Sequence, residues 1–238
     1  MLRAVLFDWG DTLMRWDWDD AYFQVANEAA LSALARDDAP TAAAIGEYFR
    51  DRPELISWAG EDEVDYPEVM RAMLGHLGCA VDDDDLERYL EAQYWSWVDS
   101  AIMLGATTYA LLESLRARGL KLGLVSNAFD PPRLLHANLE RMGVAERLDV
   151  AVFSSEVGKR KPHRVIFERA LQSLDVDPED ALFVGDRRVQ DVGGAAQLGM
   201  KTVQAVWFRA DENPDGAEPD YVAFTPYDVL NIVNRLRA

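Results

Sequence analysis

The stretch Ala4-Val5-Leu6-Phe7-Asp8-Trp9-Gly10-Asp11-Thr12-Leu13 decides the fold. Its four consecutive apolar side chains predict a buried strand, and the carboxylate of Asp8 follows directly. Gly10 comes two residues later, so we expect the strand to end there in a tight loop. Open parallel sheets bind ligands at the carboxyl ends of their strands, which makes Asp8 a candidate functional residue. Taken alone, the stretch favours an aspartate that only caps the loop, so the rest of the chain has to decide.

Length and composition limit the class of protein. The chain has 238 residues, 49% of them hydrophobic, which suits one large domain or a domain with a substantial insert. The single cysteine, Cys79, excludes a disulfide framework. A net charge of −18 argues against nucleic acid or an anionic membrane as a partner. With neither a signal peptide nor a membrane-spanning stretch in the sequence, we expect a cytoplasmic protein. An oligomeric state is not indicated.

The negative charge is concentrated in one segment. Residues 14–103 carry 21 acidic and 6 basic side chains, whereas the rest of the chain is nearly neutral. This asymmetry predicts a helical cap domain over residues 14–103, inserted into a core of residues 1–13 and 104–238. Apolar side chains at helical spacing predict cap helices over 17–36, 66–77 and 86–98. Trp16 and Trp18 follow the Asp8 loop so closely that they either pack in the cap or contact a substrate.

Strands and helices alternate from about residue 104 onward. We expect strands over 120–125, 149–153, 181–184, 202–206 and 221–224, with helices over 107–118, 131–142, 162–174 and 226–236 between and after them. Together with 4–7 they predict an α/β fold, a doubly wound, mainly parallel Rossmann-like sheet with the smaller all-helical cap.

Polar residues at the predicted strand ends converge on one crevice. They are Asp8, then Ser126 and Asn127, then Asp186, with Lys161 at the start of a following helix. Magnesium takes hard oxygen ligands, usually one or two carboxylates together with phosphate oxygens. A hydroxyl, an amide and an ammonium group neutralise and orient a phosphate, and a free aspartate can attack it. The set therefore predicts magnesium-dependent phosphoryl transfer.

Four motifs in this order resemble those of the haloacid dehalogenase-like hydrolases. They are Phe7 to Leu13, Leu124-Val125-Ser126-Asn127, Lys161-Pro162, and Val184-Gly185-Asp186 with Asp191 five residues later. The resemblance implies Asp8 as nucleophile, and Mg²⁺ held by Asp8, the Gly10 carbonyl, Asp186 and Asp191. It also implies that Ser126, Asn127 and Lys161 bind phosphate, and that the cap is mobile. Asp191 is assigned either to the metal, to orienting Lys161, or to a helix N-terminal cap.

One position departs from the family pattern. Phosphatases of this family usually read Asp-x-Asp-Gly-Thr, and the second aspartate is the general acid and base. Here Gly10 takes that place and the carboxylate stands at Asp11. Asp11 either reaches the leaving group through an altered loop or points away as a cap. Without an acid, the chain is expected to favour leaving groups of low pKa, such as aryl or acyl phosphates, over alkyl esters.

Three function classes follow. The favoured one is a hydrolase, a magnesium-dependent phosphatase that hydrolyses a small-molecule phosphate ester through an aspartyl-phosphate. The second is a metal-free haloacid dehalogenase, which has no need of the Asp186 and Asp191 motif. The third is an attenuated phosphate-binding protein that lacks the usual acid. The sequence does not name the substrate.

Overall fold

The central element is one parallel sheet. The structure is a computed structural model that describes residues 1–17, 19–56, 60–208 and 215–237. Within these residues six strands pair in parallel in the order β5-β4-β1-β6-β7-β8. The strands are β1 (Ala4–Phe7), β4 (Lys121–Ser126), β5 (Val150–Phe153), β6 (Ala181–Gly185), β7 (Lys201–Ala205) and β8 (Tyr221–Ala223). The chain winds outward from β1 in both directions, which confirms the predicted doubly wound α/β class.

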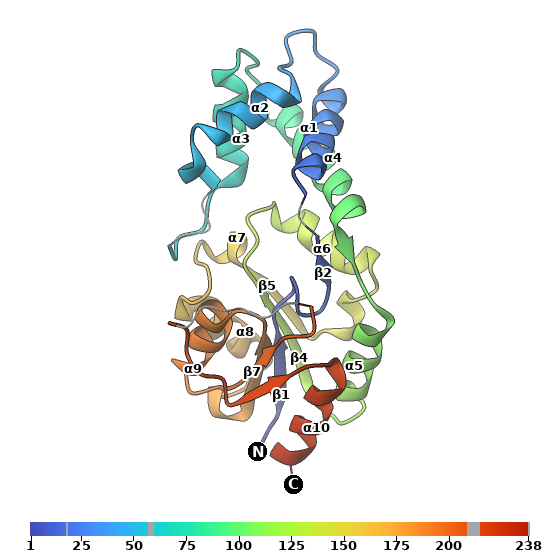
Figure 1. Cartoon of the computed structure of the whole chain (residues 1–238), viewed down its shortest axis with the longest axis vertical. Helices are drawn as coiled ribbons and strands as arrows, with labels where there is room; N and C mark the ends of the chain where they lie inside the picture. Colours follow the sequence, from blue (N-terminus) through green and yellow to red (C-terminus); the bar gives the residue numbers. More distant parts are fainter. Residues whose placement is uncertain (18, 57–59, 209–214, 238) are drawn as a thin grey trace.

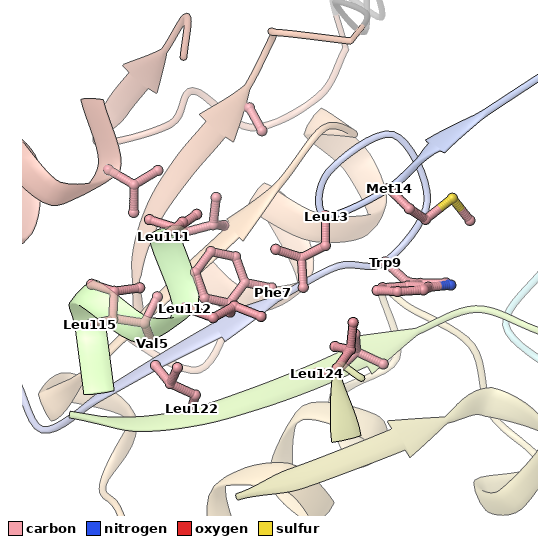
Figure 2. Packing of buried hydrophobic residues seen from close by; sticks show 14 of the residues in the cluster. Val5, Phe7, Trp9, Leu13, Met14, Leu111, Leu112, Leu115, Leu122 and Leu124 are labelled. Atoms are coloured by element: carbon pink, nitrogen blue, oxygen red, sulfur yellow. The ribbon is translucent and has the colours of Figure 1, made fainter. Parts of the chain in front are cut away.

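Strand β1 is buried on both faces, as its unbroken apolar run predicts. Val5 and Phe7 belong to one core cluster, with buried side chains of the helices α5 (Ala106–Arg116), α6 (Pro132–Arg141) and α10 (Pro226–Leu236). Figure 2 shows them beside leucines of α5, with Trp9, Leu13 and Met14 continuing this core into the loop after the strand. Ala4 and Leu6 point to the other face and join a second cluster with α8 (Arg164–Leu174).

The predicted helices are confirmed to within a few residues at each end. The helices beside the sheet are α5 (Ala106–Arg116), α6 (Pro132–Arg141), α7 (Ser154–Val157), α8 (Arg164–Leu174), α9 (Gly194–Ala196) and α10 (Pro226–Leu236). The helices of the insert are α1 (Asp20–Leu34), α2 (Ala42–Arg50), α3 (Tyr66–His76) and α4 (Asp83–Ala101). Of these, α2, α7 and α9 were not predicted. The four aspartates Asp82 to Asp85 stand at the start of α4, and the Asp82 side chain accepts a hydrogen bond from the Asp85 N–H at 2.8 Å.

The insert stands at one end of the molecule. Figure 1 shows α1 to α4 beyond the strand ends, with both chain termini at the opposite end. The prediction of an all-helical insert is wrong at its two ends. There β2 (Arg15–Trp16) and β3 (Ile102–Met103) pair as an antiparallel ribbon. Strands of two residues are too short to show a periodic pattern, so this ribbon was not predictable from the sequence. In the described residues no helix is both long and apolar enough to cross a bilayer.

Candidate active site

The loop after β1 holds Asp8 at the carboxyl end of the sheet. The Asp8 N–H donates to the Val184 carbonyl at 2.9 Å, which continues the pairing of β1 with β6. The loop then turns back, and the N–H groups of Leu13 and Met14 both donate to the Trp9 carbonyl, at 3.0 and 3.1 Å. Outside the loop, the Trp207 indole N–H donates to the Thr12 carbonyl at 2.9 Å. These hydrogen bonds therefore hold the loop, and with it Asp8, at the carboxyl end of the sheet.

Lys161 connects two of the predicted carboxylates. Its Nζ lies 2.6 Å from Asp8 Oδ1 and 2.6 Å from Asp191 Oδ1, and the lysine side chain is 3% exposed. Burial alone would lower the pKa of Lys161, but Asp191 and Asp8 outweigh it and raise the pKa above its ordinary value. For Asp8 burial dominates, and it raises the pKa to about 6 against the opposing effect of Lys161. The site thus keeps a charged ammonium group beside Asp8.

Asp191 lies in the helical turn Arg188–Gly193 that follows β6. Its Oδ1 faces Lys161, and its Oδ2 accepts a hydrogen bond from the Arg187 N–H at 2.9 Å. Its two carboxylate oxygens therefore contact the Lys161 ammonium group and the start of the turn at the same time. The close approach depends on Gly185, because a Cβ at that position would lie 2.4 Å from Asp191 Cγ. A glycine at the end of β6 is thus required by packing.

Three buried carboxylates form the candidate metal centre. Asp8, Asp186 and Asp191 each offer an oxygen, and these oxygens lie within 4.8 Å of one another. With Lys161 the four side chains carry a formal charge of −2 when ionised, which is costly to bury without a cation. Hard oxygen donors are what magnesium prefers, so the donor set fits the predicted Mg²⁺.

Ser126 and Asn127 end β4 and line the same cavity as Asp8. The Asn127 side chain makes two hydrogen bonds to the Lys161 backbone. Its Oδ1 accepts from the Lys161 N–H at 2.7 Å, and its Nδ2 donates to the Lys161 carbonyl at 3.1 Å. Asn127, predicted to bind phosphate, therefore holds the lysine segment in this structure. The buried Ser126 lies directly at the cavity wall.

Gly10 and Asp11, the two positions that depart from the family pattern, also line the cavity. Asp11 has a left-handed backbone (φ 55°), and its Oδ1 accepts a hydrogen bond from the Trp16 N–H at 3.3 Å. This bond favours the loop-capping interpretation, although the residue lines the cavity. A Cβ on Gly10 would lie 3.9 Å from Met14 Cε and 4.0 Å from Trp16 Cε3, so the space beside Gly10 is bounded by an indole ring.

The cavity has a volume of about 570 Å³ and lies between the sheet end and the insert. The predicted residues in its wall are Asp8, Gly10, Asp11, Ser126, Asn127, Lys161 and Asp191; Asp186 adjoins it as the neighbour of Asp8 and Asp191. Trp16 also lines the cavity, which is compatible with the alternative that this residue contacts a substrate. Trp18 lies outside the described residues.

A second connection joins the insert to the core beside this cavity. We call it the clasp, formed by residues 61–63 and residues 158–160. The Glu63 N–H donates to the Gly158 carbonyl at 3.1 Å, and the Arg160 N–H donates to the Glu61 carbonyl at 2.8 Å. Lys159 pairs with Asp62, and the Glu63 carboxylate accepts from the Ser154 hydroxyl. The clasp ends immediately before Lys161.

Comparison with known proteins gives the family. A family model described as haloacid dehalogenase-like hydrolase matches residues 2–199. The chain belongs to this family. The hydrolase is 28% identical over 239 residues to a glyceraldehyde 3-phosphate phosphatase of Methanopyrus kandleri, with 99% of each chain covered. It is 31% identical over 221 residues to the protein of that name from Pyrococcus abyssi, covering 88% of this chain and 82% of the relative.

Solved structures agree on the fold of the hydrolase. A 2-haloacid dehalogenase from Pseudomonas syringae superposes with a TM-score of 0.69 at 22% identity, covering 99% of this chain and 100% of that one. At this identity the likeness concerns the fold alone.

Several residues that line the cavity of the hydrolase were not predicted as site residues from the sequence. They are Tyr94 and Trp97 of α4, Ile102 of β3, Asp130, Arg160 and Arg187. Two of these carried a weak signal, since Arg160 precedes Lys161 and Asp130 follows Asn127 by three residues. The aromatic residues of α4 carried no signal of a site, because their helical spacing is equally typical of core packing.

Proposed function

We propose that the hydrolase is a magnesium-dependent phosphatase of a small phosphorylated metabolite, with Asp8 as nucleophile. One observation carries the proposal: Lys161 lies 2.6 Å from both Asp8 and Asp191, and the oxygens of Asp8, Asp186 and Asp191 lie within 4.8 Å of one another. This combination of acceptor oxygens and one fixed ammonium group suits a phosphate and a divalent cation. The two relatives named glyceraldehyde 3-phosphate phosphatase support this choice of reaction.

In the proposed reaction a carboxylate oxygen of Asp8 attacks phosphorus. The bond from phosphorus to the ester oxygen breaks, and its electron pair leaves with that oxygen. Lys161 and Ser126 bind phosphate oxygens, while Asn127 and Asp191 keep the lysine in place. Water then attacks the aspartyl-phosphate, which releases inorganic phosphate and restores Asp8. Asp8, Asp186 and the Gly10 carbonyl would hold Mg²⁺, which when bound neutralises negative charge on the phosphate.

Residues 14–103 act in this proposal as a cap over a catalytic core of residues 1–13 and 104–238. The cavity supports it, because Trp16, Tyr94 and Trp97 of the insert share its wall with Asp8 and Lys161 of the core. The partner is then a small phosphate ester enclosed between the two parts.

The test is phosphate release from a panel of phosphate esters, with and without magnesium. Removal of metal with EDTA should abolish release, and added Mg²⁺ should restore it. Asp8→Asn should lower turnover by about 10³-fold or more, because a carboxamide is a poor nucleophile. The exposed Asp84→Asn, which removes the same charge, is the matched control. Turnover by folded Asp8→Asn within tenfold of the parent would contradict the assignment.

The two alternatives give different results in the same assay. Chloride release from haloacids that resists EDTA would indicate the metal-free dehalogenase. Magnesium and phosphate binding without any turnover would indicate the attenuated binding protein, for which Gly10 in place of the acid is the supporting observation.

A further inference from the structure

The insert gives the cavity an aromatic and apolar wall. Trp16 of β2, Tyr94 and Trp97 of α4, and Ile102 of β3 all line the space that also contains Asp8 and Lys161. The ring faces and the isoleucine side chain offer this ligand space mainly apolar surface. They are the groups that bury the organic part of a ligand.

The two indoles are fixed against each other. The rings of Trp16 and Trp97 lie edge to face, with centroids 5.4 Å apart, and Tyr22 contacts Trp97 from α1 at 6.4 Å. Packing of β2 and α1 against α4 explains these contacts. It does not explain why both indoles remain partly exposed in a wall of the cavity. A preformed aromatic wall binds a planar ring at little cost in side-chain entropy.

Gly10 links this wall to the reacting atoms. It lies two residues after Asp8, and a Cβ there would lie 4.0 Å from Trp16 Cε3 and 3.9 Å from Met14 Cε. Any side chain at position 10 would therefore extend into the space beside the Trp16 ring. The glycine carries no carboxyl group and leaves this space open. We define the aromatic recess as the space bounded by Trp16, Trp97 and Gly10.

We infer that the aromatic recess receives the leaving group, and that the substrate is an aryl phosphate, in which the ester oxygen is bonded directly to an aromatic ring. The inference rests on the proposed phosphatase function. Stacking beside Trp16 binds the ring, and the ring in turn makes the missing acid unnecessary.

The chemistry of the first step balances without a proton donor. Asp8 forms a bond to phosphorus, the bond to the ester oxygen breaks, and the electron pair departs on a phenolate. A phenol has a pKa of about 10, as in tyrosine, so the phenolate leaves unprotonated and takes its proton from water. An alkoxide is about as basic as hydroxide, the conjugate base of water with a pKa of about 15.7, and needs an acid in the transition state.

Three phosphate esters and one acyl phosphate separate the ring from the acidity of the leaving group. Phenyl phosphate has both properties, benzyl phosphate has the ring alone, acetyl phosphate has the acidity alone, and ethyl phosphate has neither. The inference predicts low KM values for the two esters with a ring. It predicts kcat values at least about 10²-fold higher for phenyl and acetyl phosphate than for benzyl and ethyl phosphate.

Variants of the wall test the recess directly. Trp97→Leu and Trp16→Leu should raise KM for phenyl and benzyl phosphate, relative to acetyl and ethyl phosphate, by about three- to tenfold. Trp95→Leu is the matched control, because Trp95 belongs to the same helix but is absent from the cavity wall and stacks under Arg141. That variant should leave the KM ratio unchanged.

Substitutions at position 10 should change kcat and ring binding in opposite directions. Gly10→Asp should raise kcat for benzyl and ethyl phosphate by supplying an acid, and should weaken binding of both ring esters by filling the recess. Gly10→Ala fills part of the same space without an acid, so it should weaken ring binding alone.

Failure of the inference is distinct from failure of the proposed function. Phosphate release from all four compounds with equal KM values, unaffected by Trp97→Leu, would overturn the aromatic recess and leave the phosphatase intact. Release neither from these four compounds nor from the wider panel of phosphate esters would overturn the phosphatase. The recess is then still tested by calorimetry on Asp8→Asn, where phenyl phosphate must bind about tenfold more tightly than ethyl phosphate. Equal affinities there would overturn it.

Discussion

The guanidinium group of Arg160 lies 3.7 Å from the carboxylate of Glu63, and both side chains are 2% exposed. The two residues come from the core and from the insert, so the clasp contains a buried ion pair. Removing one partner of such a pair leaves the other charge in a poorly solvated place, which costs more than the loss of a surface pair.

Glu63→Ala should therefore lower the free energy of unfolding by about 3 kcal/mol. The matched control is Glu68→Ala, which loses a pairing with Arg71 at a glutamate that is 67% exposed and should cost less than about 1 kcal/mol. Urea unfolding of both variants measures the difference. Equal losses would mean that the clasp pair behaves like a surface pair.

Gly185→Ala should reduce both stability and activity. Its Cβ would meet Asp191 at 2.4 Å, so Asp191 has to move and its contact with Lys161 is lost. We expect a loss of about 2 kcal/mol or more and at least tenfold lower kcat/KM. Gly46→Ala in α2 is the control, because a Cβ there meets nothing within 4 Å and an alanine should stabilise the helix by up to about 1 kcal/mol. A kcat/KM equal to that of the parent in Gly185→Ala would mean that Lys161 functions without its contact with Asp191.

Asn127→Ala should lower kcat/KM by about 10- to 100-fold, because both of its hydrogen bonds hold the Lys161 backbone. Asn127→Asp keeps the acceptor for the Lys161 N–H and loses the donor to its carbonyl, so it should retain more activity than alanine if acceptance is the main role. A larger effect on kcat than on KM would mark a positioning residue. An effect on KM alone would instead favour the original prediction of direct phosphate binding.

Asp130 should make stability depend on pH. Burial, with a smaller contribution from Glu63, raises the pKa of this cavity-lining carboxyl group from 3.8 to about 7. The folded chain therefore keeps a proton that the unfolded chain loses above about pH 4, and stability falls as the pH rises from 4 to 7. Asp130→Asn, which keeps the neutral form, should equal the parent near pH 4 and exceed it at pH 8.

The size of this effect has an upper limit of about 4 kcal/mol for a shift of three units, reduced by the partial exposure of Asp130. Urea unfolding at pH 5 and pH 8 measures it, with Asp84→Asn as the charge-matched control. A stability difference that is the same at both pH values would contradict the raised pKa.

The sheet and the order of elements were predictable because local patterns encode them. The run 4–7 is apolar at every position, and a strand buried on both faces needs this. The helix α10 was predicted with both of its ends, since Pro226 is tolerated in a first turn and the apolar spacing continues to Leu236. The site residues at strand ends followed from the sheet, because the carboxyl ends of parallel strands meet at one edge.

The connections between the insert and the core were not predictable. Glu63 and Arg160 are 97 residues apart, and neither belongs to a periodic pattern. The use of Asn127 on the Lys161 backbone depends on the loop conformation, which residue types alone do not specify. The roles inferred for Asp8, Ser126, Asn127, Lys161, Asp186 and Asp191, and for the Gly10 carbonyl, remain predictions for the experiments above.

The ribbon of β2 and β3 has a consequence for how this architecture changes over time. Arg15 pairs with Met103 and Trp16 with Ile102, and the Asp17 N–H donates to the Ala101 carbonyl at 3.0 Å. The chain thus leaves and re-enters the core at neighbouring points, about 5 Å apart as in any antiparallel pair. An insertion with adjacent ends can be lengthened, shortened or replaced without moving a strand of the sheet. Under the proposed function, a foreign cap grafted at this junction would therefore change which substrate is bound while the sheet keeps its form.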